Sequence, residues 1–154
     1  MLKKIAAVCA ALAVASVANA QVKPEDQIKF RQSGYTFMAW NMGKIKAQVV
    51  DTPASYNKEQ VLAAARVIAA VANSGMGALY SPGTDKGKGW KETRLKPEFF
   101  SQQDEVKTVA MAFNKEANEL AKVAEGGDVA AIKAQFAKVG DACGACHKKF
   151  RRDE

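Results

Sequence analysis

The chain has 154 residues, of which 48% are hydrophobic and 25% are charged, and its formal net charge is +7 at pH 7. This length suits a single domain. The basic residues are spread along the chain rather than clustered with aromatic residues, which argues against a nucleic-acid-binding protein and leaves a solvated surface with weak attraction for acidic partners.

Residues 1–20 have the pattern of a secretory signal peptide. Two lysines give a positive start, residues 5–17 are apolar, and Ala18-Asn19-Ala20 is a small-residue cleavage site. The apolar run is too short to cross a membrane. We therefore expect an exported protein whose mature part, residues 21–154, forms one domain without a membrane anchor.

A first helix is predicted to begin near Pro24, because proline suits the first turn of a helix. A stripe of large side chains with a period of seven follows, with a second row beside it. Arg31 occupies that second row, where an interior charge is costly unless it has a partner. Either a buried anion pairs with Arg31, or its head group reaches water at the mouth of the bundle. The stripe contains Ile28, Tyr35, Met38, Met42, Ile45 and Val49.

A second helix is predicted after a turn at residues 51–56. Asn57 and Gln60 have the spacing of a capping box, and Asn73-Ser74-Gly75 ends the helix. Residues 75–97 then hold five glycines and two prolines. A long irregular segment is often functional, so this one folds over an edge of a bound group or is a mobile connection.

Two further helices complete the prediction. The third begins near Pro97 and ends at Gly126-Gly127, and Asp128 is a suitable N-cap for the fourth. Four amphipathic segments without strand-like alternation predict an all-α fold, an antiparallel four-helix bundle. We expect the tryptophans, Trp40 and Trp90, to be packing residues.

The last helix carries Cys143-Gly144-Ala145-Cys146-His147, the attachment sequence of a c-type haem. Each thiol can form a thioether with the haem, and the adjacent imidazole can bind the iron from one side. Both cysteines lie on one apolar stripe, which places the haem inside the bundle and predicts one covalent haem c per chain. The stripe is Val129, Ile132, Phe136, Val139, Cys143, Cys146 and Phe150.

Cysteine pairs at this spacing also occur in zinc sites, redox dithiols and disulfides. A zinc site needs four ligands, but the chain has a single histidine and one further cysteine, Cys9, in the signal peptide. A thioredoxin-like dithiol needs a βαβ context, which the sequence does not indicate. A disulfide remains an alternative in an exported protein. Bacterial c-type haem is attached outside the cytoplasmic membrane, so we expect the protein in the bacterial periplasm.

The whole mature chain resembles the class II c-type cytochromes, above all cytochrome c′, in which the haem motif lies at the C-terminus of a four-helix chain. The local matches are Lys23-Pro24-Glu25-Asp26, Phe30-Arg31-Gln32-Ser33, Ser81-Pro82-Gly83-Thr84 and the stretch from Cys143 to Arg151. The resemblance implies that Arg31 and Gln32 bond the haem propionates and that Thr93 contacts the haem edge. It also implies that Arg151 borders the proximal pocket and that two bundles pair as a homodimer.

The sixth position on the iron decides the function. Methionine is a common axial ligand, and Met38 and Met42 lie on the first helix. In six-coordinate class II relatives the ligand methionine lies about three residues after the position of Gln32, where this chain has Tyr35. Tyr35 therefore favours five-coordinate iron with a crowded distal pocket.

Two functions follow from these alternatives. The first is a protein that binds nitric oxide and carbon monoxide and sequesters nitric oxide, with some electron-transfer capacity. The second is a low-spin electron carrier that uses Met38 or Met42 and a periplasmic redox partner. A peroxidase would want a distal acid–base residue, and the one histidine is already committed, so we do not expect an enzyme.

Overall fold

The computed structural model describes residues 22–153, so the predicted signal peptide at residues 1–20 lies outside the described residues. Within this range the regular elements are helical, and the predicted all-α fold is confirmed. No helix between residues 22 and 153 is both long and apolar enough to span a membrane. The main helices are α1 (Pro24–Lys46), α2 (Lys58–Ala72), α3 (Glu98–Ser101), α4 (Gln103–Gly126) and α5 (Val129–Phe150), with short turns η1 (Ala47–Asp51), η2 (Pro53–Ser55) and η3 (Met76–Leu79).

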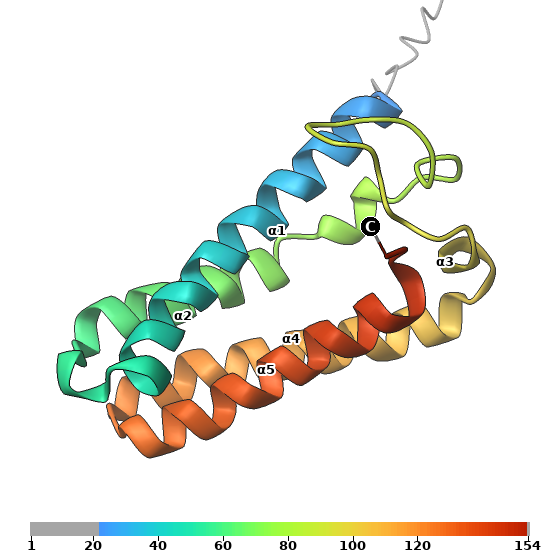
Figure 1. Ribbon diagram of the computed structural model, residues 1–154. Coiled ribbons are helices and arrows are strands. Elements are labelled where there is room, and N and C mark those ends of the chain that lie inside the picture. Colours follow the sequence, from blue (N-terminus) through green and yellow to red (C-terminus); the bar gives the residue numbers. More distant parts are fainter. Residues whose placement is uncertain (1–21, 154) are drawn as a thin grey trace, which may run out of the picture.

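The four long helices run antiparallel to their neighbours in the sequence (Figure 1). The main packing pairs are α1 with α2, α2 with α4, and α4 with α5. The helices converge where α1 turns into α2 and α4 turns into α5 (Figure 1). They separate at the other end, where the segment between α2 and α4 and the C-terminal end of α5 lie (Figure 1). The bundle therefore has a closed end and an open end.

Local hydrogen bonds explain where the helices begin. The Asn57 side chain accepts a hydrogen bond from the main-chain N–H of Gln60 at 3.0 Å, and Asp128 accepts one from Ala130 at 2.9 Å. Both predicted N-caps are thus confirmed. The capping box is not reciprocal, because the main-chain N–H of Asn57 donates to the side chain of Gln48 at 2.8 Å, where a capping box would use Gln60. Gln48 thereby links η1 to the start of α2.

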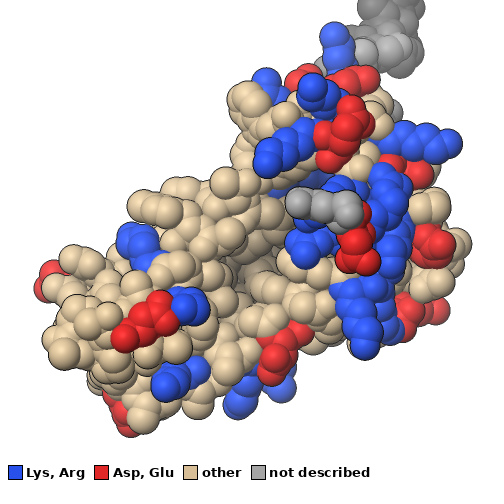
Figure 2. All heavy atoms as spheres, viewed as in Figure 1, with Lys and Arg blue, Asp and Glu red and all other residues tan. Residues whose placement is uncertain are grey.

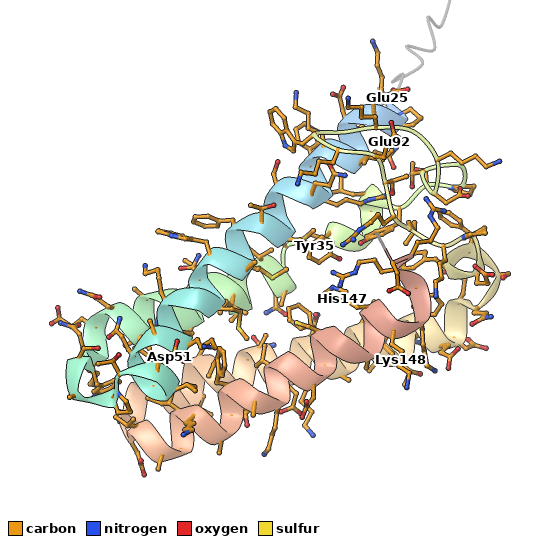
Figure 3. All side chains as sticks on the ribbon, viewed as in Figure 1. Glu25, Tyr35, Asp51, Glu92, His147 and Lys148 are labelled. Atoms are coloured by element: carbon orange, nitrogen blue, oxygen red, sulfur yellow. The ribbon has the colours of Figure 1, made fainter. Side chains whose placement is uncertain are left out.

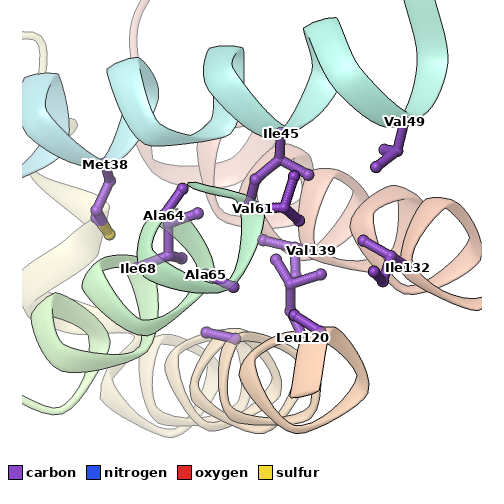
Figure 4. Close-up of a cluster of buried hydrophobic side chains, with 12 residues drawn as sticks. Met38, Ile45, Val49, Val61, Ala64, Ala65, Ile68, Leu120, Ile132 and Val139 are labelled. Atoms are coloured by element: carbon purple, nitrogen blue, oxygen red, sulfur yellow. The ribbon is translucent and has the colours of Figure 1, made fainter. Parts of the chain in front are cut away.

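The closed end is held by a core of buried apolar side chains from all four long helices and η1 (Figure 4). Positions of the predicted stripes on the first and last helices, such as Ile45 and Ile132, are fully buried. Alanines on α2 allow α2 to lie close to its neighbours. The core cluster is Met38, Ile45, Val49, Val61, Ala64, Ala65, Ile68, Ala117, Leu120, Ala124, Ile132 and Val139.

The structure differs from the prediction in two places. The third helix is broken at Gln102, where the side chain of Gln103 donates to the main-chain oxygen of Phe99 at 2.6 Å and ends α3. This break lets Phe99 stack on Tyr80, with ring centroids 4.5 Å apart. The two tryptophans do not pack in the core, because Trp40 is 59% exposed and Trp90 is 62% exposed.

Candidate functional site

A cavity of about 1910 Å³ opens between the separated helices at the open end. It is visible as a hollow in the surface (Figure 2). Its volume exceeds the roughly 300–1,000 Å³ that suits a drug-sized ligand. One wall is formed by α5 with both motif cysteines and His147, and the opposite wall by α1 with Tyr35. The cavity is therefore large enough for a planar macrocycle and carries the predicted attachment residues.

The wall formed by α5 presents two free thiols. Cys143 and Cys146 are partly buried and are not joined in a disulfide. Burial raises the pKa of both thiols, so each is protonated at neutral pH. Residues 22–153 contain no cluster of three or more His, Cys, Asp or Glu side chains that could hold a metal ion on its own. The chemistry available on this wall is that of two thiols and one imidazole on a single helical face.

His147 lies between these cysteines and the C-terminal end of α5. Burial, with further contributions from the charges of Arg151 and Arg94, lowers the pKa of the imidazole. The neutral imidazole, which is the form that binds metals, is therefore favoured at neutral pH. The main-chain N–H of Arg151 donates to the His147 oxygen at 3.0 Å, and Arg151 pairs with Leu95 in an isolated bridge. Arg151 thus lies beside His147, at the edge of the cavity.

Tyr35 lies on the α1 wall, and Figure 3 shows Tyr35 and His147 on the sides of α1 and α5 that face each other. The side chain is 44% exposed because it faces the cavity. Its hydroxyl is 2.7 Å from the hydroxyl of Tyr80. Met38 and Met42 also line the cavity, but Met38 is only 7% exposed and Met42 packs on the same core. Of these three side chains, Tyr35 is the most exposed.

Arg31 is buried, with 4% of its surface exposed. Its Nη1 donates to the Leu79 oxygen at 3.2 Å and to Thr84 Oγ1 at 2.8 Å, and its Nη2 donates to the Thr84 oxygen and to Thr93 Oγ1 at 2.8 Å. The alternative in which the Arg31 head group reaches water is therefore wrong. Its acceptors come from the end of η3 and from the segment between η3 and α3. The predicted bond from Arg31 to a propionate stays a prediction.

Gln32, the next residue on α1, also binds the irregular segment at residues 79–96. Its Oε1 accepts from the main-chain N–H groups of Trp90 at 2.8 Å and Lys91 at 3.2 Å, and its Nε2 donates to the Lys91 oxygen at 2.9 Å. Gly89 allows this approach, because a Cβ there would lie 2.6 Å from the main-chain nitrogen of Lys29. The segment is thus attached along α1, beside the cavity.

Thr93 lies where this segment meets the end of the chain. Its side chain accepts from Arg31, and its main-chain oxygen accepts from Arg152 Nη2 at 2.7 Å. The main-chain N–H of Lys96 donates to the Phe150 oxygen at 2.9 Å, and that of Arg152 donates to the Arg94 oxygen at 2.8 Å. Residues 79–96 therefore connect the N-terminal half of α1 to the C-terminal end of α5.

The sequence motifs do not include Tyr80, Lys91 and Arg94, which also line the cavity. Lysine and arginine side chains gather beside the hollow (Figure 2). Four basic residues and one acidic residue line the cavity, namely Arg31, Lys91, Arg94 and Arg151 against Glu92. No sequence periodicity points to Lys91 or Arg94, whereas the charge balance of the lining indicates that the cavity suits a group with carboxylates.

The chain matches the family described as Cytochrome C' over residues 26–151. It belongs to the cytochrome c′ family. A cytochrome c′ from Rhodocyclus tenuis is 58% identical over 132 residues, covering 86% of this chain and 98% of that protein. One from Allochromatium vinosum is 53% identical over 152 residues, covering 98% of this chain and 97% of that protein. The predicted family is confirmed.

Solved structures of cytochromes c′ share the fold. One, with a ligand-controlled dimer dissociation, is 55% identical and covers 86% of this chain and 98% of its own, with a TM-score of 0.81. That from Thermochromatium tepidum is 54% identical and covers 87% of this chain and 100% of its own, with a TM-score of 0.81. A nitric oxide complex of a variant from Alcaligenes xylosoxidans is 32% identical and covers 86% and 98%, with a TM-score of 0.74. The four-helix bundle is thereby confirmed.

As a member of this family, the chain binds haem c covalently, with iron. The side chains that line the cavity fit this group. It holds two protonated thiols on one helical face, an imidazole favoured in its neutral form, and basic groups at the mouth. Cys143 and Cys146 are the residues that would carry the thioethers, and His147 is the residue that would bind the iron.

Proposed function

We propose that this cytochrome c′ family member holds five-coordinate iron through His147, binds nitric oxide and carbon monoxide, and sequesters nitric oxide in the bacterial periplasm, with some electron-transfer capacity. The observation that carries the proposal is the position of Tyr35 across the cavity from the haem motif. When bound, the haem supplies an iron that takes small molecules as ligands and changes its redox state. The protein is a binding protein in this account, and no step needs a catalytic residue.

The distal wall favours small neutral ligands. The Tyr35 hydroxyl lies 2.7 Å from that of Tyr80, and a proton that it donates to Tyr80 is not available to a ligand. Apolar side chains such as Val71 and Phe113 also line the cavity. Desolvation of an anion in such surroundings is costly without a partner, whereas nitric oxide and carbon monoxide lose little hydration. The basic groups lie at the mouth, where they would pair with the haem carboxylates.

Relatives support both the ligands and the assembly. Structures of Alcaligenes xylosoxidans cytochrome c′ variants include a carbon monoxide complex and a nitric oxide complex, and another relative has a ligand-controlled dimer dissociation. In this chain α1 exposes a row of aromatic side chains, Phe30, Phe37 and Trp40. Exposed apolar rows of this kind suit an interface. A homodimer through α1 and α2 therefore forms part of the proposal, and sedimentation with and without carbon monoxide tests it.

The attachment residues can be tested by mass. In a host that matures c-type cytochromes, the wild-type chain should retain the mass of haem after denaturation. Cys143→Ala should weaken the attachment and the Cys143→Ala/Cys146→Ala double variant should abolish it, because each thiol supplies one thioether. Ser74→Ala, at the end of α2, is a control that should keep the haem. A double variant that still carries covalent haem would contradict the assignment.

The distal residue can be tested by substitution of Tyr35. Tyr35→Met should shift the iron part-way to a low-spin state with a methionine-to-iron charge-transfer band. The reason is that a methionine thioether is a common axial ligand of haem iron, whereas the Tyr35 phenol does not bind the iron in this proposal. Tyr56→Met is the matched control, because Tyr56 does not line the cavity. An unaltered spectrum in Tyr35→Met would show that Tyr35 is not over the iron.

The electron carrier remains the second candidate, because Met38 and Met42 both line the cavity. Its signature would be a low-spin spectrum of the wild-type protein that does not respond to carbon monoxide. Met38→Leu or Met42→Leu would then convert the protein to a high-spin form. In the five-coordinate account, both variants keep the wild-type spectrum.

A further inference from the structure

Tyr80 contacts the proposed distal residue from the irregular segment between α2 and α3. It follows η3, in the irregular segment, and its hydroxyl lies 2.7 Å from that of Tyr35, a residue 45 positions earlier in the chain. Gly34, next to Tyr35, allows η3 to approach α1, because Met76 packs where a side chain would stand, 3.1 Å from an added Cβ. The two phenols therefore meet at the wall of the cavity.

The Tyr80 ring is held from both sides. The Arg31 guanidinium lies 4.6 Å from the ring centroid, and Phe99 stacks on the ring at 4.5 Å with an interplanar angle of 21°. Phe99 in turn meets Phe150 of α5 edge to face at 5.6 Å. Arg31 is itself fixed by its four hydrogen bonds to the segment. Stacking and cation–π contacts of this kind leave the Tyr80 hydroxyl at a defined position.

Tyr35 is held much less firmly. Its side chain is 44% exposed toward the cavity. Among residues 22–153, the hydroxyl of Tyr80 is the one side-chain hydrogen-bond partner of Tyr35. A partly exposed ring with one tether can change its rotamer when that tether breaks. The asymmetry means that Tyr80 sets the orientation of Tyr35, and not the reverse.

We propose that Tyr80 is a positioning residue that holds the Tyr35 ring across the cavity, so that a ligand enters only when the Tyr35–Tyr80 hydrogen bond breaks. This inference rests on the distal role proposed for Tyr35. It adds that ligand access depends on Tyr80, which belongs to residues 79–96. Through Arg31 and Phe99, access also depends on how this segment is attached to α1 and α3.

The experiment compares the haem-loaded wild type with Tyr80→Phe, Tyr35→Phe and the double variant. Each substitution removes one hydroxyl and keeps the ring, so packing against Arg31 and Phe99 is retained. Because a neutral hydrogen bond contributes about 1 kcal/mol, Tyr80→Phe should raise the carbon monoxide association rate about fivefold. Tyr35→Phe should give the same increase, and the double variant no more, because all three lack the same bond.

A second measurement does not involve ligand binding. In urea unfolding, Tyr80→Phe and Tyr35→Phe should each lower the equilibrium constant for folding about fivefold, and the double variant should be no less stable than either. Tyr56→Phe is the matched control, because the Tyr56 hydroxyl is buried without a hydrogen-bond partner in the described part of the chain. Its removal should leave the association rate unchanged and should not reduce stability.

The outcomes separate this inference from the proposed function. If Tyr35→Ala raises the association rate but Tyr80→Phe does not, the positioning role is wrong and the distal role stands. If Tyr35→Ala also leaves the rate unchanged, both are wrong. Additive losses of stability in the double variant would show that the two hydroxyls act independently, which would also overturn the inference.

Discussion

The two ends of the bundle are held together by different forces. At the closed end, apolar side chains such as Ile45, Leu120 and Ile132 are fully buried, and the four helices meet directly. At the open end, the helices are separated by a cavity and connected by residues 79–96, largely through hydrogen bonds. Core packing tolerates no gap of this size. A polar network can frame a cavity, because its contacts are directional and few.

The largest predicted effect is at the closed end. Leu120→Ala should lower the free energy of unfolding by about 2–5 kcal/mol, because Leu120 is fully buried in the core and its truncation leaves a cavity. Met111→Ala on the same helix, where Met111 is 62% exposed, is the control and should change the free energy of unfolding far less. Urea unfolding measures both. Equal losses would mean that the closed end is not the stabilising core.

A smaller and more local effect is predicted at the open end. Arg31→Lys keeps the charge but removes the planar set of donors that binds Thr84 and Thr93, so it should cost about 1–3 kcal/mol. Hydrogen exchange should speed up mainly in residues 79–96, while the helices of the closed end keep their protection. Arg66→Lys, at an exposed ion pair with Glu125, is the control. Uniform loss of protection along the chain would contradict two separately held ends.

The smallest effect concerns alkaline pH. Burial raises the pKa of Tyr35 and Tyr80 above the ordinary value of about 10. Their mutual contact raises the pKa of Tyr80 further and lowers that of Tyr35, and the Arg31 charge lowers both, but burial dominates. The unfolded chain therefore loses these protons first, and stability falls as pH rises through about 10. Urea unfolding between pH 8 and pH 11 should show a shallower fall in the Tyr35→Phe/Tyr80→Phe variant. Tyr56, whose pKa burial also raises, contributes to the slope that remains. The same slope in variant and wild type would contradict this assignment.

Sequence reasoning predicted the closed end better than the open end. The stripes that contain Ile45 and Ile132, and the cap at Asp128, depend on spacing within one helix, which the sequence displays directly. The haem motif is also local, and its two cysteines fall on the predicted face. The contacts of Arg31 with Thr84 and Thr93 span 53 and 62 positions and follow no period. The sequence therefore shows that Arg31 needs a partner, but not which one.

The same limit explains the residues that were missed or misjudged. Tyr80 lies in a segment rich in glycine and proline, and its contact with Tyr35 follows from the path of that segment through space. Trp40 and Trp90 were expected to pack, but Trp40 stacks on Phe37 at the surface and Trp90 donates to Ser33 at 2.8 Å. Aromatic residues outside a clear stripe carry no signal that separates a core position from an exposed one.

The central claim is that the iron is bound by His147 on one side and is open to a small ligand beneath Tyr35 on the other. The most direct test is one absorption spectrum of the purified, haem-loaded protein before and after addition of carbon monoxide. We predict a high-spin or mixed-spin spectrum that changes when carbon monoxide is added. A low-spin spectrum with a methionine-to-iron charge-transfer band, unchanged by carbon monoxide, would contradict the account.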